Sequence, residues 1–128
     1  MRILLADRQS RVRSALRLLL EQRDDTFALS EAENGTAVLA ELRRGCPDLL
    51  LLDWDLPGLS RADLIAALKR QCPCLAVIVL DSQPQRKEAA LRAGADGFVS
   101  KNDPPELLLA AIENSRRAAG RTPFQHEK

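Results

Sequence analysis

The chain alternates short apolar runs with amphipathic segments. Apolar residues that recur every three or four positions predict helices, whereas short, densely apolar runs between turn residues predict strands. The predicted strands are residues 2–6, 26–32, 49–52, 75–80 and 95–100, and the predicted helices are residues 10–22, 34–45, 60–71, 84–94 and 103–118. Strands and helices that alternate in this way predict an α/β fold, in which right-handed crossovers wind helices over both faces of a parallel sheet.

Turn and capping residues support these boundaries. Asn34 and Ser60 each precede an amphipathic segment as helix caps, and Pro84 stands in the first turn of another. Residues 49–52 are four consecutive leucines, which is typical of a central parallel strand covered on both faces. This strand ends at a carboxylate, Asp53.

The length and composition fit one domain. The chain has 128 residues, of which 45% are hydrophobic, enough for one buried core but not for two. We expect residues 1–118 to form this domain and residues 119–128 to form a polar C-terminal tail. The apolar run at the N-terminus is interrupted by Asp7, and no run is long enough to cross a membrane, so we expect a cytoplasmic protein.

The charge balance argues against direct nucleic-acid binding. The chain has 19 Lys and Arg against 18 Asp and Glu, no Tyr and one Trp. A net charge of +1 gives neither a basic footprint for phosphates nor attraction to anionic lipid, and stacking platforms for bases need more aromatic residues.

The three cysteines do not predict a disulfide framework. Cys72 and Cys74 flank a proline, but neither a second cysteine pair nor a nearby His completes a zinc site. We interpret the cysteines as small apolar or incidental side chains.

Polar side chains follow four of the five predicted strands. Ligands of doubly wound sheets bind beyond the carboxyl ends of the strands, so these positions are candidates for a site. They are Asp7, Arg8, Asp53, Asp81, Ser82 and Lys101. Any one of them could be the polar residue that must follow a buried strand, but their convergence on one crevice predicts a functional site.

Four stretches resemble the receiver domain of two-component response regulators, and the resemblance runs from Met1 to about Arg117. The stretches are residues 3–7 (ILLAD), 47–58 (PDLLLLDWDLPG), 77–80 (VIVL) and 93–101 (AGADGFVSK), of which the second and fourth are specific. The resemblance implies a flavodoxin-like, five-stranded sheet in the order 2-1-3-4-5 with about five helices.

The resemblance also implies a role for each candidate residue. Asp53 is the phosphoacceptor, Lys101 contacts the phosphoryl group and Phe98 holds the aromatic switch position. Asp7, Asp53 and the backbone carbonyl of Asp55 are implied ligands of Mg²⁺. This chemistry suits the residue types, because a carboxylate that attacks a phosphoryl group needs positive charge to offset the anions brought together.

Two positions depart from the family pattern. Receivers usually carry two adjacent acids after the first strand, but Arg8 stands at the second position, so we expect weakened metal binding. Asp81 follows the fourth strand, where receivers have the Thr or Ser that hydrogen-bonds the phosphoryl group. The switch position is therefore either Asp81 or Ser82, and Asp81 either faces the pocket or turns outward as a capping residue.

The implied function is phosphorelay signalling by a protein that is not an enzyme. A histidine kinase or phosphotransfer protein would phosphorylate Asp53, and a downstream effector protein would read the result. The face between the fourth and fifth helices is the implied surface for a partner or a homodimer. Leu107, Leu108 and Ile112 can serve that surface only where the core leaves them exposed.

Two other interpretations stay open. Asp53 and Asp55 resemble the Asp-x-Asp motif of haloacid-dehalogenase-like phosphatases, but that motif lies on the first strand and continues with Thr or Val where Pro57 stands, so this reading is disfavoured. The stronger alternative is a pseudo-receiver, which keeps the fold and an interaction surface but works without phosphorylation. Arg8 and Asp81 favour that alternative, whereas the intact phosphoacceptor and lysine oppose it.

Overall fold

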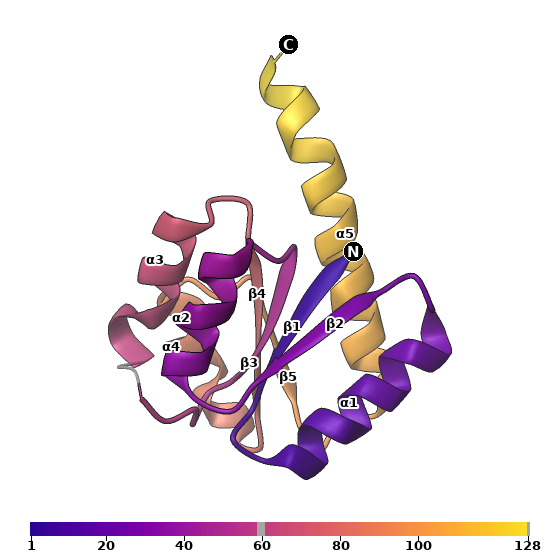
Figure 1. Cartoon of the computed structure of the whole chain (residues 1–128), viewed down its shortest axis with the longest axis vertical. Helices are drawn as coiled ribbons and strands as arrows, with labels where there is room; N and C mark the ends of the chain where they lie inside the picture. The colour runs from indigo at the N-terminus through magenta and orange to yellow at the C-terminus, as the bar shows by residue number, and fades with distance from the viewer. Residues whose placement is uncertain (59–60, 128) are drawn as a thin grey trace.

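The computed structural model of the chain is a five-stranded parallel sheet between two layers of helices (Figure 1). It describes residues 1–58 and 61–127. The strand order is β2-β1-β3-β4-β5, and every neighbouring pair is parallel. The predicted α/β fold and strand order are thus confirmed.

The elements alternate along the chain as the sequence predicts. The strands are β1 (Arg2–Ala6), β2 (Ala28–Ala32), β3 (Leu49–Asp53), β4 (Ala76–Asp81) and β5 (Gly97–Ser100), and the helices are α1 (Ser10–Arg23), α2 (Gly35–Arg44), α3 (Arg61–Gln71), α4 (Lys87–Arg92), preceded by the 3₁₀ turn η1 (Pro84–Arg86), and α5 (Pro105–Glu127). Asn34 caps α2 as expected, because its side-chain oxygen accepts a hydrogen bond from the Ala37 N–H at 2.8 Å. The predicted cap at Ser60 lies outside the described residues.

Each face of the sheet packs against its own layer of helices (Figure 1). Helices α2, α3 and α4 cover one face and α1 and α5 cover the other. Successive side chains of a strand point to opposite faces, so Leu50 and Leu52 of β3 join the first core and Leu49 and Leu51 join the second. None of these four leucines is more than 1% exposed, which makes β3 the rigid centre of the sheet.

Glu31 on the edge strand β2 fixes the position of α1. Its two carboxylate oxygens each lie 2.9 Å from a guanidinium Nε, one of Arg13 and one of Arg17. Arg13 also donates through Nη1 to the backbone carbonyl of Asp7 at 2.6 Å. The same arginine therefore connects the α1 contact to the loop that follows β1.

A disulfide joins Cys46 to Cys72, with a Cα–Cα distance of 5.8 Å, and only Cys74 among the three cysteines is a free thiol. The interpretation of the cysteines as small apolar or incidental side chains was therefore wrong for Cys46 and Cys72. Cys46 follows α2 and Cys72 follows α3, and these two helices cover the same face of the sheet. Their ends meet near the amino ends of β3 and β4, an adjacency that the spacing in the sequence does not reveal.

Helix α5 is longer than predicted. Residues 119–128 were expected to form a tail, but the backbone continues as a helix to Glu127 (Figure 1). Ahead of the expected boundary, the Ser115 hydroxyl donates to the Ile112 carbonyl, and Arg116 pairs with Glu113. In the described part of the chain, no helix is both long enough and apolar enough to cross a membrane.

The three residues named for a partner surface on α5 divide between surface and core. Leu107 is 50% exposed, whereas Leu108 and Ile112 are 5% and 2% exposed and pack against the sheet. Only Leu107 of the three is therefore available to a partner, because the other two complete the core between α5 and β5.

We expect the disulfide to contribute measurably to the free energy of unfolding. Its two cysteines are 26 residues apart, and a crosslink over a loop of that length is expected to stabilise the fold by about 3 kcal/mol, chiefly by restricting the unfolded chain. Urea unfolding of Cys72→Ala should give a lower midpoint than the wild type under non-reducing conditions. Cys74→Ser is the matched control and should leave the midpoint unchanged. A titration that finds three free thiols in the native, unreduced protein would contradict the disulfide.

The Glu31 contact predicts a pH-dependent stability. Burial alone would raise the pKa of Glu31, but hydrogen bonds and charge from Arg17 and Arg13 outweigh it and lower the pKa. A lowered pKa means that the stabilisation is present at neutral pH and is lost as the pH falls through the folded-state pKa, which lies below the ordinary pKa of a glutamate. Glu31→Gln should therefore cost about 1 kcal/mol of unfolding free energy at pH 7, since the carboxylate is a third exposed, and less at pH 3.

Glu41→Gln is the control for this measurement. Glu41 pairs at 3.5 Å with a highly exposed Arg44, so its substitution should change the free energy of unfolding little at either pH. An equal loss for Glu31→Gln at pH 7 and pH 3 would show that the arginine pairs are not its cause.

Candidate functional site

The carboxyl ends of four strands bring the predicted site residues together. Asp7 and Arg8 follow β1, Asp53 ends β3, Asp81 ends β4 and Lys101 follows β5. The three carboxylates are each only 1% exposed. Removing a carboxylate from water is costly unless a cation or hydrogen-bond donors compensate its charge, so the surrounding positive groups determine what this site can do.

Lys101 lies between two of these carboxylates. Its Nζ is 2.8 Å from Asp7 Oδ2 and 3.3 Å from Asp53 Oδ1. The Lys101 backbone N–H donates to the Asp81 carbonyl at 2.8 Å, and Asp103 closes the following turn by accepting from the Ser100 N–H at 3.0 Å. These two hydrogen bonds fix the backbone at Ser100 and Lys101, and they keep the Lys101 ammonium group beside Asp53.

Arg8 points into the site rather than away from it. Its backbone N–H donates to Asp53 Oδ2 at 3.3 Å, and its Nε lies 3.7 Å from the same oxygen. Its Nη2 is 3.9 Å from Asp55 Oδ2. The guanidinium is still about half exposed, at 49%, and its contacts are long, so it is the loosest of the cations in the site.

Arg86 is a site residue that the sequence analysis missed. From the end of η1 it reaches Asp55, with Nη2 2.9 Å from Oδ1 and Nη1 3.3 Å from Oδ2, and it also reaches Asp81, with Nη1 3.4 Å from Oδ1. The Arg86 hydrogen bond is the main cause that lowers the pKa of Asp55. The only signal in the sequence was an arginine in the first helical turn after β4, close behind Pro84.

Asp81 faces the site and does not turn outward. Besides Arg86, it accepts a hydrogen bond from the Gln83 N–H at 3.3 Å through Oδ2. Burial raises the pKa of this carboxyl, partly offset by backbone N–H donors. Ser82, the other candidate for the switch position, is exposed. Phe98 is half-buried and packs against the core under α2, α3 and α4.

These side chains form an alternating series, which we call the ion-pair chain. Its members, in order, are Asp7, Lys101, Asp53, Arg8, Asp55, Arg86 and Asp81. Each of the cations lies between two carboxylates, and a carboxylate stands at each end. Asp53, in the middle, also accepts the Asp55 N–H at 3.0 Å through Oδ1, so both of its oxygens have partners.

The side chains do not fit a divalent cation. A magnesium site needs several oxygen ligands in near-octahedral positions. Lys101 contacts both buried carboxylates of the implied set, Arg8 stands at the second acidic position, and Arg86 contacts both oxygens of Asp55. In residues 1–58 and 61–127, no group of three or more His, Cys, Asp or Glu side chains is placed to hold a metal ion. The implied ligand set of Asp7, Asp53 and the Asp55 carbonyl stays a prediction.

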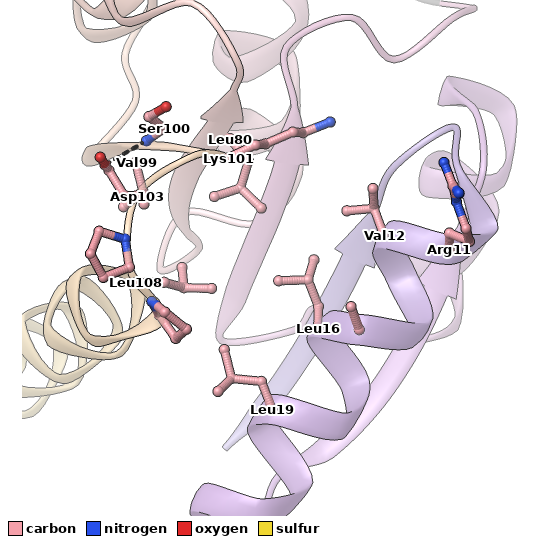
Figure 2. A pocket seen from close by; sticks show the side chains of 13 residues that line it. Arg11, Val12, Leu16, Leu19, Leu80, Val99, Ser100, Lys101, Asp103 and Leu108 are labelled. Carbon is pink, nitrogen blue, oxygen red and sulfur yellow. Dashed lines mark hydrogen bonds between the residues drawn. The ribbon is translucent and has the colours of Figure 1, made fainter.

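An apolar groove adjoins the ion-pair chain between α1 and the start of α5 (Figure 2). Its volume is about 400 Å³, and Leu16, Leu19 and Leu108 contribute to its lining. Lys101 lies on its edge, and the carboxylates of the ion-pair chain do not line it. The groove is therefore a neighbouring surface and not part of the charged site.

Relatives of known sequence place the chain in a family. Residues 3–113 match the family described as response regulator receiver domain. A Pseudomonas aeruginosa protein named as a transcriptional regulator is 41% identical over 113 residues, which make up 86% of this chain and 54% of that protein. PhoB of Escherichia coli, the phosphate regulon transcriptional regulatory protein, is 33% identical over 88% of this chain and 50% of PhoB. The chain thus spans about half the length of these curated relatives.

Solved structures agree with this placement. RcsB from Salmonella enterica serovar Typhimurium, solved on promoter rprA with the phosphomimetic BeF₃⁻, has a TM-score of 0.78 and 28% identity, over 89% of this chain and 67% of that chain. CheY4 of Vibrio cholerae, a chemotaxis response regulator, shares the fold with a TM-score of 0.77 at 21% identity, over 89% of this chain and 97% of its own. Phosphorylation and Mg²⁺ binding are typical of the family. The match covers most of the chain, which therefore belongs to the response regulator receiver domain family of two-component signalling.

Proposed function

We propose that this receiver accepts a phosphoryl group on Asp53 from a histidine kinase or phosphotransfer protein in the cytoplasm, and signals through protein contacts without being an enzyme. The observation that carries the proposal is the position of Lys101 Nζ, 2.8 Å from Asp7 and 3.3 Å from Asp53. An ammonium group fixed beside a carboxylate at the end of the most buried strand can stabilise the charge that develops when the carboxylate attacks phosphorus.

The scaffold also supports Asp53 as the nucleophile. Its strand is held by β1 and β4 on either side and covered on both faces, so the carboxylate has little freedom to leave its position. Asp7 orients Lys101, because its Oδ2 lies 2.8 Å from the ammonium group. Asp55 and Asp81 lie one step further along the ion-pair chain and face Arg86.

The pseudo-receiver stays the second candidate, and one observation favours it. Both oxygens of Asp53 already have partners, Oδ1 near Lys101 and the Asp55 N–H, and Oδ2 near Arg8. In this alternative the ion-pair chain is a permanent structural element, and the protein works as an interaction or dimerisation module in its unmodified state.

The proposed switch position is Asp81, with Phe98 as the aromatic switch. Asp81 is buried at the end of β4, whereas Ser82 is exposed, and Asp81 pairs in register with Ser100 at the end of β5. A carboxylate that is ionised cannot donate the hydrogen bond that a Thr or Ser hydroxyl donates to a phosphoryl oxygen. Arg86, which contacts Asp81, is the donor available at this place.

If Asp53 is the phosphoacceptor, the protein should gain the mass of one phosphoryl group. Incubation of the wild-type protein with phosphoramidate and magnesium chloride should add one phosphoryl group, and Asp53→Asn should add none. Asp63→Asn is the matched control, because Asp63 is an exposed carboxylate of α3 that is not a member of the ion-pair chain. Intact-mass spectrometry measures all three proteins. Modification of Asp53→Asn would overturn Asp53 as the acceptor, and no modification of the wild type would favour the pseudo-receiver.

A further inference from the structure

We propose that Arg8 and Arg86 take the place of the divalent cation in this site, so that Asp53 accepts a phosphoryl group without a metal ion. The inference rests on the proposed function of Asp53, and it adds a role for Arg86 and a changed cofactor requirement. It follows from the disagreement between the side chains of the site and a magnesium ligand set.

The first step in the argument is the charge around Asp53. A phosphoryl group that approaches this carboxylate meets the negative charges of Asp7, Asp55 and Asp81 as well. Each of these has a cationic partner within 4 Å: Lys101 for Asp7, and Arg86 for both Asp55 and Asp81. The repulsion that a divalent ion would offset is therefore already offset by side chains.

Arg86 contributes by holding two carboxylates away from the phosphoryl group. Its side chain is only 18% exposed, and its two nitrogens contact both oxygens of Asp55 and one of Asp81. A planar guanidinium matches two carboxylate oxygens at once and stays charged at any pH of interest. Without it, Asp55 and Asp81 would both lose their guanidinium contact, and their negative charge would be offset less.

Arg8 contributes by direct contact with the reacting carboxylate. Its Nε lies 3.7 Å from Asp53 Oδ2, and its Nη2 lies 3.9 Å from Asp55. These distances exceed those of a good hydrogen bond, and the side chain is half exposed, so it can move toward added negative charge at small cost. Arg8 and Lys101 then contact the phosphoryl oxygens from opposite sides of Asp53.

Phosphoryl transfer to Asp53 needs only a small phosphodonor and these residues. An Asp53 carboxylate oxygen attacks the phosphorus of phosphoramidate and forms a new O–P bond. The P–N bond breaks with its electron pair moving to nitrogen, which leaves as ammonia because it is already protonated in the donor. The group added to Asp53 carries its charge on three oxygens, which Lys101 and Arg8 are placed to contact.

The test compares phosphorylation with and without available metal. The wild-type protein is incubated with phosphoramidate either in excess chelator or in magnesium chloride, and the phosphorylated fraction is followed by intact mass. We expect the two rates to agree within about threefold. Arg86→Gln and Arg8→Gln should each slow the reaction in chelator by about tenfold or more, since each removes one charge from the reacting centre. Arg92→Gln is the matched control, because this exposed arginine of α4 pairs only with Glu88 among the ion pairs of the described residues.

A second variant tests whether removing the arginine charge restores a need for magnesium. Arg8→Asp returns an acid to the position where receivers usually have one, and it should make phosphorylation depend on magnesium. Trp54 follows Asp53 directly and reports on this region by its fluorescence. A magnesium titration should change the Trp54 emission of Arg8→Asp at a concentration at least about tenfold lower than that of the wild type.

The possible outcomes separate the inference from the proposed function. Wild-type phosphorylation that occurs in magnesium chloride but not in chelator overturns the inference and keeps Asp53 as phosphoacceptor. No phosphorylation in either solution overturns both. Should Arg86→Gln fail to fold, Arg8→Asp still decides the question, because an unchanged rate in chelator for that variant would show that Arg8 does not replace the metal.

Discussion

The site depends on one constraint, which is that three buried carboxylates at the same edge of the sheet must each keep a cationic partner. Asp7, Asp53 and Asp81 are almost fully removed from water. The cost of that burial is met by Lys101, Arg8 and Arg86, which come from three different connections of the fold. The ends of β1, β3, β4 and β5 and the start of α4 are thereby held in one arrangement by charge.

Different interactions stabilise the two ends of the sheet. At the carboxyl ends of the strands, the backbone is fixed by burial of β3 and the loops are fixed by ion pairs. Near the amino ends of β3 and β4, the Cys46–Cys72 disulfide holds the ends of α2 and α3 together. Changes in charge at one end and changes in thiol chemistry at the other therefore act on separate parts of the fold.

The sequence was sufficient for the order of strands and helices and for most of the site. A short apolar run between prolines, such as residues 49–52, is typical of a buried parallel strand, and parallel strands bring their carboxyl ends together, so Asp53 and Lys101 could be placed in one crevice. Arg86 could not, because its contribution depends on how far a long side chain reaches from the turn before α4. The pairing of Cys46 with Cys72 likewise depends on how α2 and α3 pack, which no periodicity encodes.

The unequal exposure of the three cations has a consequence for how the site responds to ionic strength. Lys101 and Arg86 are 19% and 18% exposed, so dissolved ions screen their contacts weakly, whereas Arg8 is 49% exposed. Added salt therefore weakens the central link first. The side-chain ion pairs then fall into two groups, one of Asp7, Lys101 and Asp53 and one of Asp55, Arg86 and Asp81, which the Asp55 N–H to Asp53 hydrogen bond still joins. Salt concentration thus sets how strongly Asp53 is coupled through Arg8 to Asp55 and Arg86.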